Sequence, residues 1–92
     1  MPAHNVAISN KLGLHARPAM TFAESAGRFA SVIRVRRSDS DDSVDGKSIM
    51  QLLMLAGTKG TELVITAEGA DATDALKELV RLVNAGFDDD EG

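Results

Sequence analysis

Two side chains suited to phosphoryl chemistry stand close together in the run Gly13-Leu14-His15-Ala16-Arg17-Pro18-Ala19. After Pro18, apolar residues recur at the spacing of one helical face and Gly27 is a typical stop, so we expect a helix over residues 16–26. A proline is tolerated there because N–H groups of a first turn have no intrahelical partner. The pattern therefore predicts that His15 lies at the N-terminal end of a helix.

A histidine in that position is suited to accept a phosphoryl group. Helix N-termini present N–H groups and the positive end of the helix dipole, which favour a bound anion. The same field and the Arg17 guanidinium disfavour imidazolium, so we expect His15 to be neutral and nucleophilic near neutral pH. Arg17 could then stabilise the phosphohistidine through charge-assisted hydrogen bonds. For an isolated His-x-Arg sequence, a capping histidine beside an exposed arginine is the commoner reading, so the rest of the chain must decide.

A second motif, Asp45-Gly46-Lys47-Ser48, invites a nucleotide-binding interpretation that fails. A P-loop needs a glycine five residues before Gly46, where this chain has Asp41. Ser48 is instead predicted to cap a short helix over residues 48–55, because its hydroxyl can accept from first-turn amides. Since so short a helix buries one face only, we expect Leu52 and Leu55 to point inward.

Periodicity along the chain predicts the order strand, helix, strand, strand, helix, strand, helix. The expected strands cover residues 5–9, 29–35, 43–47 and 61–67, and the helices cover 16–26, 48–55 and a last segment between Asp71 and Gly86. Val6 and Ile8 would face the core, Asp71 would cap the last helix and Gly86 would end it. The strands are half-buried and each helix has one apolar face. This combination favours an α+β fold, in which an antiparallel sheet has helices on one face.

The composition indicates one small domain, which we place at residues 1–87, followed by a disordered acidic tail over 88–92. The 92 residues are 43% hydrophobic, which suffices for one core. With no cysteine and two histidines we expect no disulfide, metal or other cofactor, and a cytoplasmic location. The sequence predicts neither a signal peptide nor a membrane span.

The charges also argue against nucleic-acid binding. The net charge is −4, and the chain has no tyrosine or tryptophan for base stacking. A basic cluster stands beside several aspartates, so we interpret it as solvated charge at a strand end. Its members are Arg28, Arg34, Arg36 and Arg37, and the neighbouring acids are Asp39, Asp41 and Asp42. We therefore expect protein partners.

Two motifs, in the order in which they occur along the chain, resemble those of a known protein family. The run from Gly13 to Ala19, followed by Lys47-Ser48-Ile49-Met50, resembles HPr, the histidine-containing phosphocarrier of the bacterial phosphoenolpyruvate:sugar phosphotransferase system. The similarity extends from about Val6 to Phe87. It implies an open-faced β-sandwich of order βαββαβα, a four-stranded antiparallel sheet with three helices on one face. It also implies that His15 takes phosphate from Enzyme I on Nδ1 and passes it to an EIIA domain, with Arg17 assisting both transfers. We expect the chain to be a monomer.

The same resemblance assigns roles to the second motif. The serine that matches Ser48 is phosphorylated by HPr kinase/phosphorylase in many bacteria, which can change affinity for a transcriptional regulator. Phosphorylation would add a charge of about −2 beside whatever docks on that helix. Three apolar residues match the patch that engages Enzyme I in the family, and we expect them to be partly exposed: Ile49, Met50 and Leu53.

Three hypotheses follow. The chain is a phosphocarrier that needs partner enzymes, a regulatory binding protein whose phosphorylation controls partner affinity, or a stand-alone histidine hydrolase. The last is disfavoured because a single imidazole at an open helix end lacks an orienting carboxylate and an enclosed pocket. The regulatory reading stays open because residues 52–55 and 84–88 resemble the nitrogen-related branch of the family, NPr. In addition, Asp45-Gly46 stands where sugar-system members often have Asn-Ala.

Overall fold

The protein forms strands and helices in the predicted order, seen in a computed structural model that describes residues 2–55 and 57–88. The strands are β1 (Ala3–Ala7), β2 (Val32–Arg37), β3 (Ser43–Asp45) and β4 (Glu62–Glu68). The helices are α1 (Ala16–Ala26), α2 (Ile49–Met54) and α3 (Ala72–Asn84), followed by a short 3-10 turn, η1 (Gly86–Asp88). The predicted βαββαβα order is confirmed, with η1 added after the last helix.

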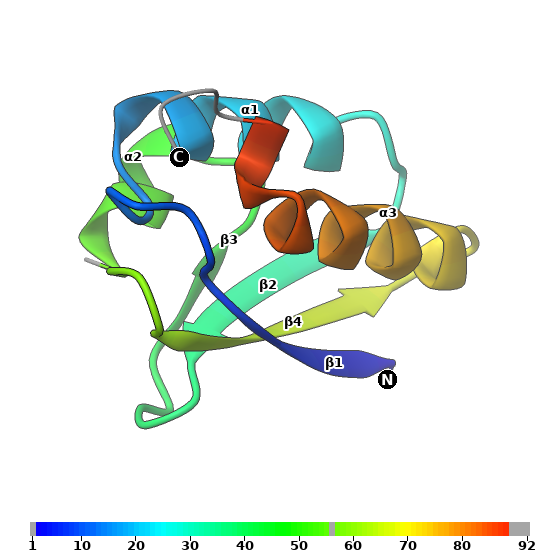
Figure 1. The fold of residues 1–92 in the computed structure, drawn as a ribbon. Coiled ribbons are helices and arrows are strands. Elements are labelled where there is room, and N and C mark those ends of the chain that lie inside the picture. Colours follow the sequence, from blue (N-terminus) through cyan, green and yellow to red (C-terminus); the bar gives the residue numbers. More distant parts are fainter. Residues whose placement is uncertain (1, 56, 89–92) are drawn as a thin grey trace.

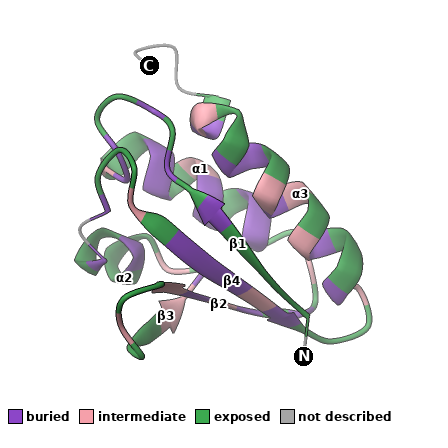
Figure 2. Ribbon diagram, turned by 60° about the horizontal axis from the view of Figure 1, so that its bottom comes forward, coloured by how far each residue is buried: buried purple, intermediate pink, exposed green. Residues whose placement is uncertain are grey.

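The strands form one antiparallel sheet with the spatial order β1-β4-β2-β3. All three helices cover the same face and leave the other face open (Figure 1). Figure 2 shows buried residues along the central strand β4 and along the inner sides of α1 and α3. The predicted α+β open-faced sandwich is therefore confirmed.

One cluster of apolar side chains fills the space between the sheet and the helices. Val6 and Ile8 are buried in it as predicted, and α1 contributes Phe22, which is 1% exposed. One face of α3 also packs against this cluster, with Ala72, Ala75, Leu79 and Val83 buried and Leu76 and Val80 partly buried. Burying a side chain as large as Leu, Ile or Phe stabilises the fold by about 1.5–3 kcal/mol, so this cluster fixes how the helices lie on the sheet.

The start of β2 differs from the prediction of a strand over residues 29–35, because the ladder begins at Val32. The Asp71 carboxylate accepts hydrogen bonds from the Ala30 amide (2.8 Å), the Ser31 amide (2.9 Å) and the Ser31 hydroxyl (2.5 Å). These two amides are therefore taken by a side chain rather than by a neighbouring strand. Asp71 is the N-cap residue of α3, as predicted, but for the same reason its side chain makes no hydrogen bond to its own helix.

β3 also ends earlier than predicted, at Asp45 rather than residue 47. The Asp45 carboxylate accepts from the Lys47 amide (3.0 Å), and the Asp45 carbonyl accepts from the Ser48 amide (3.1 Å). Such local bonds form a turn that competes with the ladder. β1 ends at Ala7, although the next residue, Ile8, still donates its amide to the Thr61 carbonyl (2.9 Å).

The carboxyl-terminal end of α3 is closed by glycine, as predicted. Gly86 has φ +69°, a conformation that favours glycine, and the following Phe87 is only 1% exposed. Phe87 therefore holds the end of the helix against the core. Asp88 belongs to η1, and the rest of the predicted disordered tail, residues 89–92, lies outside the described residues.

The contacts of Asp71 predict a stability that depends on pH. Hydrogen bonds from the Ser31 hydroxyl and then from the Ala30 amide lower the pKa of Asp71. A carboxylate with a lowered folded-state pKa stabilises the fold above its unfolded pKa, and this contribution is lost as pH falls through the folded pKa. Asp71→Ala should therefore lower Tm at neutral pH, and its deficit should shrink below about pH 4. Circular dichroism melts across this range measure the effect.

The control is Asp42→Ala in the exposed β2–β3 hairpin. A Tm deficit of Asp71→Ala that stays constant with pH would contradict the prediction.

Candidate functional site

Two loops meet beside the N-terminus of α1 and set the position of His15. The Leu14 amide donates to the Gly57 carbonyl (2.9 Å). Gly13 has φ +74°, and a Cβ built there would lie 2.5 Å from the Gly57 carbonyl oxygen and 2.8 Å from the Thr58 Cα. Glycine is thus required at position 13 both by its backbone conformation and by the neighbouring backbone.

Asn10 holds the other side of the same loop. Its side-chain Nδ2 donates to the Gly13 carbonyl (2.7 Å), and its own carbonyl accepts from the Gly13 amide (3.2 Å). Asn10 is buried, and its Oδ1 has no hydrogen-bond partner among the described residues. Sequence reasoning missed this residue. The available signal was an asparagine shortly before a glycine in a loop, a combination typical of turns.

His15 immediately precedes the first turn of α1, as predicted. Its backbone is extended (φ −94°, ψ −168°), and its carbonyl accepts the first helical bond from the Ala19 amide (2.9 Å). Its side chain is half-buried and does not cap the helix, and the first turn contains no acidic residue. No carboxylate of that turn therefore offsets the positive end of the helix beside the imidazole.

Arg17 belongs to the same first turn and is exposed. An imidazole, a guanidinium and the N-terminal end of a helix thus come from three consecutive residues of one short segment. Imidazole is a nucleophile, and guanidinium and helix N–H groups both bind phosphate oxygens. The arrangement can hold a phosphoryl group that His15 has taken up.

The second motif forms the start of α2. Ser48 is half-buried, and its Oγ accepts from the Gln51 amide (3.3 Å), so it caps the helix as predicted. The Gln51 side chain in turn accepts from the Asp45 amide (2.9 Å). The Lys47 ammonium donates to the Phe29 carbonyl (2.8 Å) and so ties this segment to the loop after α1.

Gly46 has a packing role rather than a nucleotide-binding one. A Cβ at this position would lie 2.6 Å from Ile33 Cγ2, and the Gly46 amide donates to the Ile33 carbonyl (2.8 Å). This close approach of Gly46 to β2 explains a glycine before Lys47 and Ser48 without any phosphate loop.

α2 exposes an apolar patch, and the expected division of its residues is confirmed. Leu52 and Leu55 are 1% and 7% exposed. The outward residues include Ile49 (37%), Met50 (78%) and Leu53 (40%). Met54, also 78% exposed, was missed, although it follows Met50 by one helical turn and so shares its face. We call Ile49, Met50, Leu53 and Met54 the α2 patch.

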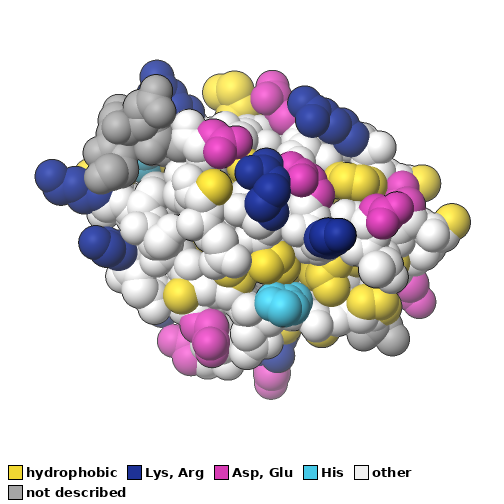
Figure 3. All heavy atoms as spheres, turned by 45° about the vertical axis from the view of Figure 1, so that its right-hand side comes forward, with side chains coloured by type: hydrophobic (Ala, Val, Ile, Leu, Met, Phe, Trp, Pro, Cys, Tyr) yellow, Lys and Arg dark blue, Asp and Glu magenta, His cyan; other side chains and the backbone are white. Residues whose placement is uncertain are grey.

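The other histidine has a different setting. His4 lies in β1 and lines a mostly apolar depression of about 310 Å³ with Pro2 and with Thr73, Leu76, Lys77 and Val80 of α3. Figure 3 shows hydrophobic side chains gathered near a histidine on this side of the molecule. In residues 2–55 and 57–88 no three His, Cys, Asp or Glu side chains are grouped so as to hold a metal ion. Each helix in the described part of the chain is too short or too polar to cross a bilayer.

Comparison with known proteins identifies the family. The family model described as "PTS HPr component phosphorylation site" matches residues 3–85. The chain belongs to the HPr family of phosphocarrier proteins. It is 50% identical over 91 residues to the HPr of Pseudomonas aeruginosa, covering 99% of this chain and 100% of that protein. It is 41% identical over 85 residues to the NPr of Klebsiella oxytoca, covering 92% and 93% of the two chains.

Solved structures agree with this assignment. The crystal structure of an HPr from Thermoanaerobacter tengcongensis matches with a TM-score of 0.89 and 38% identity, covering 97% of this chain and 98% of that one. The HPr family resemblance and its fold are thus confirmed. The chain is a phosphocarrier of the phosphotransferase system rather than a catalytic enzyme.

Gly13→Ala should destabilise the protein more than Gly60→Ala. Both glycines have positive φ, +74° and +92°, so alanine at either position introduces roughly 1–2 kcal/mol of backbone strain. A Cβ at Gly60 would meet nothing within 4 Å, whereas one at Gly13 would overlap the Gly57 backbone. Urea unfolding of both variants measures the difference in free energy of unfolding. Equal losses in the two variants would contradict the close approach of the two loops.

Proposed function

We propose that this phosphocarrier accepts a phosphoryl group on His15 from Enzyme I and passes it to an EIIA domain. The observation that carries the proposal is the position of His15 at the N-terminal end of α1, with Arg17 in the first turn. His4, by contrast, is an exposed residue of an edge strand. Of the two histidines, both in the described part of the chain, His15 alone stands at a helix N-terminus with an arginine in the following turn.

The transfer takes place in two displacements at phosphorus. First, a ring nitrogen of neutral His15 attacks the phosphorus of the donor, and the donor's bond to phosphorus breaks with its electron pair returning to the donor. Then the acceptor's nucleophile attacks the same phosphorus, and the N–P bond breaks to restore neutral imidazole. Arg17 offsets phosphoryl charge in both steps. Because Arg17 is exposed, it can do so without enclosing the phosphohistidine, and over-stabilising that intermediate would slow the second step.

The α2 patch is the proposed docking surface for Enzyme I and EIIA. Its residues are exposed although they are large and apolar, and two of them are methionines, whose flexible side chains suit contact with more than one partner. Ser48 stands directly before this patch. We propose it as the regulatory phosphorylation site for a kinase of the HPr kinase/phosphorylase type, with a transcriptional regulator as a further partner of the phosphorylated form.

We further propose residues 1–87 as a single carrier domain that acts as a monomer. A chain without cysteine suits a reducing compartment, and we propose the cytoplasm as its location.

A regulatory carrier of the nitrogen-related branch is the second candidate. NPr proteins match at 41% and 39% identity, over 92% of this chain. In that case the phosphorylation state of the chain would control its affinity for regulatory partners. The two candidates differ in their donor, so incubation with a sugar-type or a nitrogen-type Enzyme I separates them.

His15→Ala should abolish phosphoryl acceptance and leave the fold intact. The side chain of His15 is only half-buried and caps no helix, so its loss should change Tm by only a few degrees. Intact-mass spectrometry after incubation with phosphoenolpyruvate and Enzyme I measures acceptance, and mild acid should remove the adduct from the wild type.

His4→Ala is the matched control for this experiment and should accept phosphate like the wild type. An acid-stable adduct, or one that persists in His15→Ala, would contradict acceptance on His15. No adduct from either type of Enzyme I would favour a purely regulatory binding protein.

Ser48→Asp should slow phosphoryl transfer from Enzyme I by about tenfold in kcat/KM, because it adds a charge beside the apolar α2 patch. Ser48→Asn is the control: like aspartate it is a good helix cap, but it adds no charge. Steady-state transfer kinetics measure the effect. Equal rates for the two variants would mean that charge at Ser48 does not act on docking.

A further inference from the structure

The open face of the sheet carries a hollow that the proposed carrier function does not use. Its volume is about 320 Å³, and it is lined by Arg34, Arg36, Asp41, Ser43, Val64 and Thr66. Arg34 and Arg36 alternate along β2 with Ile33 and Val35, which are buried in the core beneath the helices. The hollow therefore lies on the face of the sheet opposite the helices and opposite His15.

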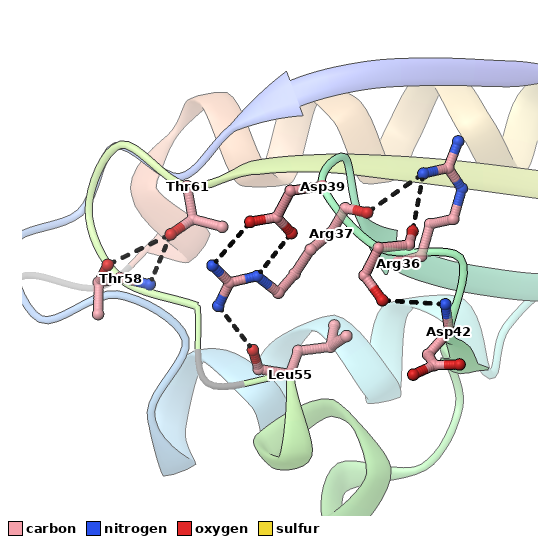
Figure 4. Close-up of polar contacts among 8 residues, drawn as sticks. Arg36, Arg37, Asp39, Asp42, Leu55, Thr58 and Thr61 are labelled. Carbon is pink, nitrogen blue, oxygen red and sulfur yellow. Dashed lines mark hydrogen bonds and ion pairs between the residues drawn. The ribbon is translucent and has the colours of Figure 1, made fainter.

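Both arginines are held in place by neutral acceptors. Arg34 donates from Nε to the Ser43 hydroxyl (3.2 Å) and from Nη2 to the Ser43 carbonyl (3.0 Å). Arg36 donates from Nη1 to the carbonyls of Arg37 (3.2 Å) and Ser40 (3.0 Å), as Figure 4 shows for the β2–β3 hairpin. A guanidinium has five N–H donors, so each arginine keeps donors for a ligand after these bonds are made.

Two carboxylates lie near this pair, because Asp41 lines the hollow and Asp45 stands opposite Arg34 in the β2–β3 ladder, but neither forms an ion pair with it. Arg37 and Arg81 form ion pairs with Asp39 (3.1 Å) and Glu78 (2.7 Å). In residues 2–55 and 57–88, by contrast, no carboxylate oxygen lies within ion-pair distance of Arg34 or Arg36. The arginines stand two residues apart on one face of a strand, about 6.6 Å along its axis, so both can reach one ligand.

We propose that this hollow binds a small phosphate-bearing ligand. Guanidinium groups match the geometry of phosphate oxygens, and Arg34 and Arg36 would each bind through charge-assisted hydrogen bonds. The hydroxyls of Ser43 and Thr66 supply further polar contacts at the same wall. Asp41 is exposed at the rim and limits affinity by repelling the phosphate. Since the hollow lies on the far side of the sheet from α1, the ligand can bind whether or not His15 is phosphorylated.

The test is a titration of the ¹⁵N-labelled full chain with pyrophosphate at low ionic strength, followed by amide shifts. We expect saturable shifts in β2, β3 and β4 around the hollow, in the wild type and in His15→Ala alike. Arg34→Gln and Arg36→Gln should each weaken binding about tenfold or more. Asp41→Asn should tighten it, because a repulsive charge is removed. A parallel titration with glycerol phosphate distinguishes a phosphomonoester ligand from a diphosphate.

Arg81→Gln is the matched control, since it also removes one positive charge but from a site on α3, and it should bind pyrophosphate like the wild type. Equal weakening in this control would mean non-specific attraction to net charge and would overturn the proposal. So would shifts confined to the start of α1 that disappear in His15→Ala, or no saturable shift at all. If the arginine variants do not fold, Asp41→Asn decides, because unchanged or weaker binding in that variant contradicts the proposed site.

Discussion

The close approach of Gly13 to the backbone of Gly57 is the contact on which the geometry of the site depends. It joins the loop before α1 to the loop after α2, two segments that are far apart in the sequence. α1 and α2 also pack against each other, so the start of α1 and the exposed face of α2 belong to the same layer of the molecule. A side chain at position 13 would separate the two loops and displace His15 from this layer. Glycine is thus required at the first position of the motif for steric reasons, because this loop contact positions the histidine two residues later.

Once the loop is fixed, the charge pattern of the helices decides where an anion can bind. α3 has Asp74 in its first turn and Arg81 in its last turn, so its own charges complement its dipole at both ends. α1 has no acidic residue in its first turn and carries Arg17 there instead. A positive side chain in the first turn is unfavourable for the isolated helix, but it leaves a positive field for an incoming phosphoryl group. Local helix stability is therefore lower at the end of α1 where the proposed function places the phosphoryl group.

Features that depend on residues within one or two helical turns could be predicted from the sequence. The bounds of α1, the cap at Ser48 and the opposite orientations of Leu52 and Leu53 all follow from local spacing. What could not be predicted depends on partners that are distant in the chain. Asp71 binds backbone amides 40 and 41 positions away, and nothing in its neighbourhood indicates that these amides would outcompete its own helix.

The candidate sites also combine features that local sequence determines with features that depend on residues distant in the chain. The residue types of His15 and Arg17 indicate their chemistry, but the loop contact that positions His15 is visible only in three dimensions. The interpretation of the basic cluster as solvated charge fits Arg37, which pairs with Asp39 two residues later. Arg34 and Arg36 instead stand within β2, on the open face, where long-range strand pairing sets the residues around them.

Under the proposed function, Ser48 would serve both stability and control. Its hydroxyl accepts from the Gln51 amide, so the fold uses it as a neutral cap for a short helix. A phosphate on that oxygen would still face first-turn amides, which favour negative charge, and the helix would keep a cap. The cost would fall on a partner that must bury Ile49 and Met50 next to a dianion and remove water from it. If Ser48 is phosphorylated as proposed, the phosphate would act on association and leave the folded domain almost unchanged, because the first-turn amides that cap the helix also favour the added charge, while a docking partner is repelled by it.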